Sequence, residues 1–254
     1  IFCLVWIKSI WATHWRALSI MNIDYPSPNF DERPAGTDID ILVLHYTGLK
    51  TLQEALDRLI DPASKVSAHY LVAENGEIFC LVPEDKRAWH AGVSYWRGLT
   101  DVNAHSIGIE LENPGHEFGY HDFPSLQMNA LIDLSRDLLS RYEITGRNVV
   151  GHSDIAPRRK KDPGELFDWK FMANKGVGLW PAESTGKGPG GDLENWLSDL
   201  GYETNNITAT LRAFQRHYLP SSISGQADTI TRRTINALVD LVGETGSNEI
   251  SNHS

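Results

Sequence analysis

Residues 41–47 read Ile-Leu-Val-Leu-His-Tyr-Thr and set the fold class of the chain. Four apolar residues follow one another without a polar interruption, which indicates a strand buried on both faces. Such strands lie inside sheets that helices cover. The apolar run stops at His45. We therefore expect the imidazole of His45, a side chain that can bind metal ions, to lie where the buried strand ends.

Strand and helix patterns are interleaved on both sides of this stretch. Thr51 and Glu54 form a capping-box pattern that opens a helix through about residue 60. Asn75-Gly76 separates two strand patterns and predicts a β-hairpin. The two hairpin strands are expected at 67–73 and 77–82, further strands at 106–112 and 149–150, and further helices at 125–138 and 168–174. The apolar face of the first of these helices is expected at Leu126, Ala130, Leu131, Leu134 and Leu138. We therefore predict an α/β fold in which helices cover a central mixed sheet.

A second, smaller unit is predicted after residue 191. Residues 186–191 read Gly-Lys-Gly-Pro-Gly-Gly, which is typical of a linker, and three amphipathic helical patterns follow. We expect a small all-α three-helix domain with few contacts to the first domain. The predicted organisation is an extension at 1–21, the main domain at 22–180, the linker at 181–191, the three-helix domain at 192–245 and a polar tail at 246–254.

The charge balance narrows the classes of partner. The formal net charge is −10 and the basic residues are scattered, so no basic face is expected for binding nucleic acid. The apolar run at 1–7 is too short to cross a bilayer, and we expect no transmembrane segment. Two interpretations of residues 1–20 remain open. They are the remnant of an exported precursor, or Met21 is the start and they are an extension.

The stretch 151–164 carries the strongest chemical signal. It reads Gly-His-Ser-Asp-Ile-Ala-Pro-Arg-Arg-Lys-Lys-Asp-Pro-Gly, and its prolines and glycines exclude a regular helix. His152 and Asp162 lie on this stiffened loop, and His45 ends the buried strand. Two histidines and one carboxylate form the ligand set of a hydrolytic zinc site whose fourth position is open to water. The alternative is that the three are unrelated surface residues, but the stiffness that the prolines give to the loop favours the metal site.

Zinc hydrolysis also needs a proton acceptor and a cation near the reacting carbonyl. Glu110 and Glu112 point to the same face of the predicted strand at 106–112, so their spacing does not choose between them. A solvated strand face is the other interpretation of both residues. Lys160 lies two residues before Asp162 and is the candidate cation, with a plain solvated lysine as its alternative.

Seven collinear stretches together resemble the zinc-dependent N-acetylmuramoyl-L-alanine amidases of the AmpD/AmiD type, which share their fold with peptidoglycan recognition proteins. The resemblance implies that His45, His152 and Asp162 bind one zinc ion, that Glu110 is the general base and that Lys160 stabilises the oxyanion. It also implies cleavage of the amide between the lactyl group of N-acetylmuramic acid and L-alanine. The stretches are 26–30, 44–47, 66–70, 87–92, 106–111, 151–155 and 160–164.

The resemblance extends to binding functions. The matched stretches also place Tyr46, His69, Trp89 and His90 as candidate substrate contacts. Residues 211–218 and 225–228 resemble a three-helix peptidoglycan-binding module. The expected partners are peptidoglycan and muropeptides, and we expect a monomer. An appended wall-binding module favours the periplasm or cell envelope as the location, with the cytoplasm as the alternative.

Two other functions remain open from the sequence. One is a peptidoglycan-recognition protein of the same fold that binds muropeptides without cutting them. The other is a zinc peptidase that cuts within the stem peptide. The third ligand, Asp162, favours an enzyme over a binding protein, whereas only the resemblance argues against the peptidase.

Overall fold

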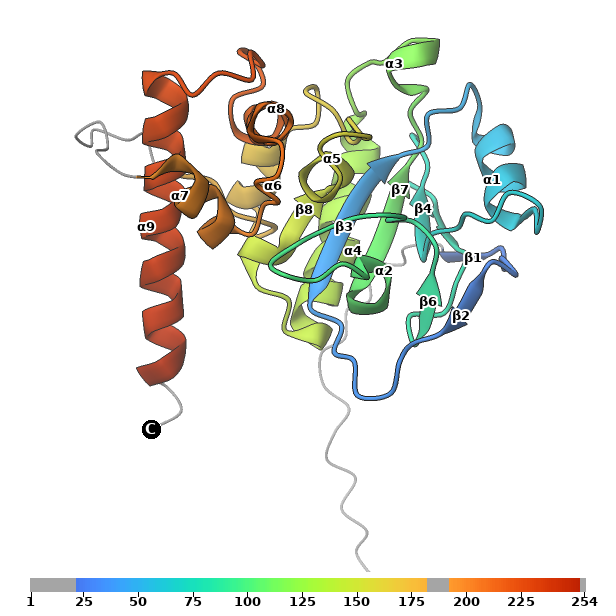
Figure 1. Ribbon diagram of the computed structural model, residues 1–254. Coiled ribbons are helices and arrows are strands. Elements are labelled where there is room, and N and C mark those ends of the chain that lie inside the picture. The colour runs from blue at the N-terminus through green and yellow to red at the C-terminus, as the bar shows by residue number, and fades with distance from the viewer. Residues whose placement is uncertain (1–21, 182–191, 252–254) are drawn as a thin grey trace, which may run out of the picture.

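The computed structural model describes residues 22–181 and 192–251, with side chains described as far as residue 243 (Figure 1). The predicted extension at 1–21 and nearly all of the predicted linker lie outside the described residues. A six-stranded sheet forms the centre of the protein, in the order β1-β5-β4-β7-β3-β8. Its strands are β1 (Asn22–Asp24), β3 (Ile41–Tyr46), β4 (Tyr70–Val72), β5 (Ile78–Cys80), β7 (Ser106–Leu111) and β8 (Val149–Gly151).

The sheet is mixed, as the sequence predicts. Strands β7, β3 and β8 are parallel neighbours, whereas β4 and β5 form the predicted antiparallel hairpin. A second sheet pairs β2 (Phe30–Glu32) with β6 (Lys86–Ala88). The helices of this part are α1 (Leu52–Ile60), α2 (Val102–His105), α3 (Gly115–Phe118), α4 (Ser125–Tyr142), α5 (His152–Ile155) and α6 (Trp169–Asn174).

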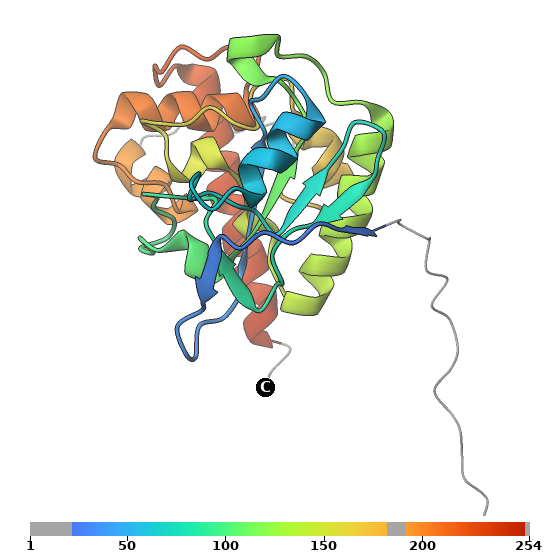
Figure 2. The same ribbon diagram turned by 90° about the vertical axis from the view of Figure 1, so that its right-hand side faces the viewer.

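Helices cover both faces of the sheet, because β3 is apolar on both. Leu42 and Leu44 pack in a cluster that includes Leu131 and Leu138 of α4. Ile41 and Val43 point the other way and join a separate cluster. In Figure 2 helix α4 lies on one side of the strands, and the orange helices of the C-terminal part lie on the other. The predicted buried strand and the α/β fold class are therefore confirmed.

The Thr51 cap is confirmed, but the Glu54 carboxylate accepts from the backbone N–H of Lys50 and not from that of Thr51, so the capping box is incomplete. The Thr51 hydroxyl oxygen accepts a hydrogen bond from the backbone N–H of Glu54, 3.2 Å away, and α1 begins at Leu52. Leu134 of α4 is buried, but Leu126 is 62% exposed. The expected apolar face of α4 therefore does not include Leu126, which lies in the first turn of the helix.

Three C-terminal helices are present, as predicted: α7 (Leu193–Leu200), α8 (Ile207–Tyr218) and α9 (Thr229–Ser251). They share a hydrophobic cluster with the main domain, in which Phe214 of α8 packs in one core with Ile41 and Val43 of β3. The expectation of few contacts between the two units is therefore wrong. The physical reason is that the apolar face of β3 opposite α4 needs a cover, and the C-terminal helices complete the core that α5 and residues 91–102 begin on this face.

A buried polar cluster strengthens the same contact. The carboxylate of Asp154 in α5 accepts hydrogen bonds from the Tyr202 hydroxyl at 2.9 Å and from Nδ1 of His217 at 2.7 Å. The His217 ring stacks on Trp169, with 3.8 Å between the ring centroids. Since Asp154 and His217 are both almost fully buried, these bonds replace water for both groups. The C-terminal helices are therefore fixed against the loop that follows β8.

The end of the chain differs from the prediction in one respect. Helix α9 continues past Gly243 to Ser251, so the first residues of the predicted polar tail are helical. Among the described residues, none of the helices is long and apolar enough to span a bilayer.

The shared core predicts one cooperative unfolding transition for both units. Phe214→Ala should lower the free energy of unfolding by about 3–5 kcal/mol, because Phe214 is fully buried in the core that both units share. Denaturant unfolding followed by tryptophan fluorescence measures this change. Ile230→Ala is the control, since Ile230 is 63% exposed on α9 and should change stability little. Two separate transitions, with only the smaller one shifted by Phe214→Ala, would contradict the shared core.

Candidate active site

A cavity of about 680 Å³ opens where the parallel strands end. It is lined by the end of β3, by α1, by the segment before α2 and by the loop that follows α5. The predicted residues that line it are Tyr46, Trp89, His90, Glu110, His152, Lys160 and Asp162. The structure therefore brings most of the predicted site residues to one place.

The three predicted ligands converge beside this cavity. Nδ1 of His45 lies 2.9 Å from Nδ1 of His152 and 3.1 Å from Oδ2 of Asp162, and the remaining distance, from His152 to Asp162, is 3.0 Å. All three side chains are buried. A tetrahedral ion with ligand bonds of about 2.0–2.1 Å needs ligand atoms about 3.3 Å apart, so the trio fits a metal ion after small adjustments.

The local fold explains this convergence. His45 lies in β3, and His152 directly follows β8, the parallel neighbour of β3. The backbone N–H of Ser153 donates to the carbonyl of Asp162 at 2.9 Å and folds the intervening loop back on α5. His45, which is distant from His152 in the sequence, and Asp162, which lies ten residues after His152, are therefore held close to His152 where β3 and β8 end.

Protonation states in the trio suit a cation. Burial, and after it His152, lowers the pKa of His45 to about 4, so this imidazole is neutral at pH 7. Burial alone raises the pKa of the Asp162 carboxyl, but the two histidines outweigh it and hold this pKa well below its usual value. A neutral imidazole and an ionised carboxylate are the forms that ligate metal ions.

Glu110 is the free carboxylate of the site. It lies opposite His45 in the β3–β7 register, and its Oε2 is buried without a hydrogen-bond partner among the described residues. Burial, and after it Asp162, raises the pKa of Glu110 well above its usual value, and a bound cation would oppose both effects. A buried ligand trio beside a free carboxylate is typical of metal-dependent hydrolases.

The structure separates Glu110 from Glu112, which the sequence pattern could not. Glu112 lies beyond the end of β7 and does not line the cavity. Its Oε2 accepts a hydrogen bond from the backbone N–H of Glu74 at 2.9 Å. Glu112 is thus engaged with the β4–β5 hairpin turn, whereas Glu110 faces the cavity.

Cations line the cavity on the side of the ligand loop. Lys160 is half-buried, and its ammonium group has no hydrogen bond or ion pair within the described part of the chain. Arg58 of α1 and Arg159 also line the cavity. Positive side chains around a cavity favour ligands that carry carboxylates.

The four predicted substrate contacts differ in their positions. Tyr46, Trp89 and His90 line the cavity, as expected. His69 does not line it and is completely buried. Its Nδ1 accepts from the backbone N–H of Gly108 at 2.9 Å, and its Nε2 donates to the carbonyl of Lys86 at 3.1 Å. The position of His69 therefore contradicts a role as a substrate contact, because its nitrogens already serve the fold.

The structure adds His116 to the site. No motif of the sequence assigns a role to His116, but it lines the cavity and bridges two other side chains. Its Nδ1 lies 2.9 Å from the Tyr46 hydroxyl, and its Nε2 lies 3.1 Å from Glu165. Arg216 of α8 lies 3.4 Å from the same Glu165. No local pattern could reveal this chain of contacts, because its members come from four separate segments.

Comparisons with known proteins agree with this site. A family described as N-acetylmuramoyl-L-alanine amidase matches residues 35–165, which include the ligand trio, Glu110 and Lys160. The N-acetylmuramoyl-L-alanine amidase AmiD of Escherichia coli is 39% identical over 81% of this chain and 84% of its own length. The 1,6-anhydro-N-acetylmuramyl-L-alanine amidase AmpD of Haemophilus influenzae is 40% identical over 57% of this chain and 86% of its own length.

Solved structures extend the similarity to the fold. The complex of Escherichia coli AmiD with the substrate anhydro-N-acetylmuramic acid-L-Ala-D-gamma-Glu-L-Lys has a TM-score of 0.74 at 37% identity, over 84% of this chain and 93% of that one. AmpDh3 of Pseudomonas aeruginosa has a TM-score of 0.75 at 32% identity, over 94% of this chain and 98% of that one. The chain belongs to the N-acetylmuramoyl-L-alanine amidase family and is an amide hydrolase of this class.

The converging trio predicts a metal ion that depends on each ligand. Purified protein should carry one ion per chain, and His152→Ala should lose it, because an incomplete ligand set binds metal weakly. Elemental analysis after dialysis measures both. His121→Ala is the control, since His121 is an exposed histidine paired with Glu74 and should leave the metal content unchanged. Full metal content in His152→Ala would exclude His152 from the site.

Proposed function

We propose that this enzyme is a zinc hydrolase that cleaves the amide between the lactyl group of N-acetylmuramic acid and L-alanine in muropeptides and peptidoglycan. The observation that carries the proposal is the buried trio of His45, His152 and Asp162 beside a cavity that His152, Asp162 and Glu110 line. Family membership supports the same bond specificity. The substrate bound to AmiD is a muropeptide of this kind.

The donor set supports zinc as the metal. Two imidazole nitrogens and one carboxylate oxygen are the three protein ligands of many catalytic zinc sites. His152 and Asp162 also line the cavity, so a zinc ion held by the trio would be accessible from it. Bound there, zinc would polarise the scissile carbonyl and lower the pKa of a water molecule.

The side chains around the trio then divide the remaining work. Glu110 takes the proton of the attacking water, for which its unpartnered oxygen is free. Lys160 stabilises the negative charge that develops on the carbonyl oxygen. Trp89 and Tyr46 offer ring surfaces to the sugar or to the stem peptide. Arg58 and Arg159 complement the carboxylates of the stem peptide by charge.

The two other functions have less support. A recognition protein that does not cut has no need of a complete ligand trio beside a free, buried carboxylate. A zinc peptidase that cuts within the stem peptide would be an exception in this family. Chromatography of a muropeptide digest separates all three, because the amidase releases the intact stem peptide, the peptidase releases fragments of it, and the recognition protein releases nothing.

The envelope remains our proposed location, with the cytoplasm as the alternative. Similarity to AmiD spans 81% of the chain, against 57% for AmpD of Haemophilus influenzae, so the C-terminal helices accompany the AmiD-like architecture. Fractionation of cells that express the native gene tests this location. That the protein acts as a monomer stays a prediction, which light scattering would check.

The role proposed for Glu110 predicts a specific loss of turnover. Glu110→Gln should keep zinc and stability but lose roughly 100-fold or more in kcat, because the amide cannot accept the water's proton. Glu112→Gln is the matched control: it carries the same change two residues away, outside the cavity, and should be far milder. Steady-state kinetics on a soluble muropeptide measures both variants. The opposite ranking of the two variants would assign the base to Glu112.

We also propose that the C-terminal helices help to hold the enzyme on polymeric cell wall. Because they share a core with the main domain, the test keeps the chain intact and changes its surface. Ile230→Glu should weaken co-sedimentation with sacculi by about tenfold, the effect of losing one buried apolar contact of about 1.5 kcal/mol. Leu126→Glu is matched in exposure but lies on α4, and it should bind sacculi normally. Unchanged binding of Ile230→Glu would exclude this side chain from the wall contact.

A further inference from the structure

His90 lines the cavity, but both of its ring nitrogens are engaged by other side chains of the protein, which leaves neither free for a substrate. Its Nδ1 lies 3.0 Å from Nε2 of His45, and its Nε2 lies 3.2 Å from the Ser106 hydroxyl oxygen. That hydroxyl lies 2.6 Å from the carbonyl oxygen of Val102 and donates its proton there. His90 therefore connects a candidate metal ligand to the protein backbone through one continuous line of hydrogen bonds.

The direction of every bond in this line follows from its last member. A backbone carbonyl can only accept, so the single proton of the Ser106 hydroxyl points at Val102. The Ser106 oxygen then accepts from Nε2–H of His90, which leaves Nδ1 of His90 without a proton. Nδ1 of His90 in turn accepts from Nε2–H of His45. The remaining nitrogen of His45, Nδ1, is thereby left with a free lone pair facing the metal position.

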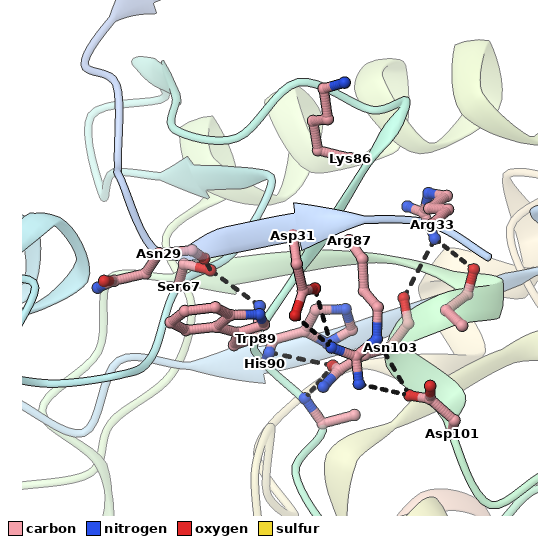
Figure 3. A network of polar contacts seen from close by, with 12 residues as sticks. Asn29, Asp31, Arg33, Ser67, Lys86, Arg87, Trp89, His90, Asp101 and Asn103 are labelled. Carbon is pink, nitrogen blue, oxygen red and sulfur yellow. Dashed lines mark hydrogen bonds and ion pairs between the residues drawn. The ribbon is translucent and has the colours of Figure 1, made fainter.

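The neighbouring residue does the same for the other histidine ligand. Nε2 of His152 donates to the carbonyl of Ala91 at 3.1 Å, which leaves Nδ1 of His152 free to bind metal. Asn103 holds this segment in place, since its side-chain oxygen accepts from the backbone N–H groups of His90 and Ala91 at 3.1 and 2.8 Å (Figure 3). One short piece of chain therefore orients both imidazole ligands.

Strand β7 is shaped to receive the His90 ring. A Cβ atom placed on Gly108 would lie 2.4 Å from Cγ of His90, so only glycine leaves room for the ring at this point of the strand. Ser106, two residues earlier on the same face, supplies the hydroxyl that orients the ring. Glu110, two residues later, faces the cavity. The polar face of β7 thus serves the site along its whole length.

We infer that His90 is a positioning residue for the metal site, which fixes the ring orientation and tautomer of His45 through Ser106, rather than a substrate contact. This inference rests on the proposed metal-dependent function. Partners of this kind raise metal affinity because a ligand held in the binding form loses less freedom when the ion arrives. Their loss typically lowers metal affinity by about 10–100-fold.

The experiment compares the zinc affinities of variants of the full chain by chelator competition, with the thermal stability of each metal-free protein measured in parallel. His90→Phe keeps a ring of similar size but has no nitrogens, and it should weaken zinc binding by about 10–100-fold. His90→Asn retains an acceptor near the position of Nδ1 and should recover part of this loss. The visible spectrum of the cobalt-substituted protein should shift in His90→Phe, because one ligand is no longer oriented.

His69→Phe is the matched control. His69 is also a fully buried histidine, and it accepts a hydrogen bond from the backbone N–H of Gly108. Its ring packs edge to face against His90, with 5.7 Å between the ring centroids, but it contacts none of the three ligands and is not part of the line of hydrogen bonds. It should lower thermal stability and leave zinc affinity and the cobalt spectrum unchanged. Equal losses of zinc affinity in His69→Phe and His90→Phe would reduce His90 to a structural role and overturn the inference.

Ser106→Ala tests the line of hydrogen bonds at a distance from the metal. Ser106 contacts no ligand, so a fall in zinc affinity of about tenfold can only arise through His90. If His90→Phe fails to fold, the zinc affinity of Ser106→Ala still tests the positioning role of His90. Wild-type zinc affinity in Ser106→Ala and in every folded His90 variant would overturn the inference but leave the metal site intact. If the wild-type protein binds no zinc, the proposed function is overturned as well.

Discussion

The parallel alignment of β7, β3 and β8 is the constraint on which the rest of the structure depends. Parallel neighbours end at the same edge of a sheet, so whatever follows them lies close together. His45 and Glu110 are partners in the β3–β7 register, and His152 follows β8. Only Asp162 has to be supplied by a loop, and that loop is held to α5 by a backbone hydrogen bond from Ser153.

A second constraint comes from burying so many polar groups around the cavity. An unpaired polar group inside a protein costs about 1–3 kcal/mol, so each buried imidazole needs partners of defined direction. The partners at His69, His90 and His152 end in backbone carbonyls, which accept and never donate. Networks that end in this way fix the tautomers. Among the described residues that line the cavity, Glu110 is the exception, and its unpartnered Oε2 is free for the role of proton acceptor that we propose.

The C-terminal helices belong to the same physical system. They complete the core on the face of β3 that α4 leaves open, and this unit supplies two hydrogen bonds to the buried carboxylate of Asp154. Asp154 lies in α5 two residues after His152, and it also accepts from the backbone N–H of Gly151. Without this unit a buried carboxylate beside the candidate ligand His152 would lose two hydrogen-bond partners, a costly loss in a dry environment. The C-terminal unit therefore stabilises the main domain through the shared core and through Asp154, independently of the wall-binding role that we propose for it.

The sequence by itself determined the elements and the residue types of the site. The apolar run at 41–44 required a buried strand, the Thr51 cap required a helix start, and His45, His152 and Asp162 already formed a ligand set. These features are local, or depend on chemistry that each side chain carries alone. The tertiary structure decided whatever depends on which surface a side chain meets. Alternation along 106–112 shows a polar face, but only packing shows that this face meets His90 and the cavity instead of water. In the same way, a glycine-rich segment predicts a linker, but only the shared core shows that the helices beyond it are docked, because apolar faces give no indication of their partners.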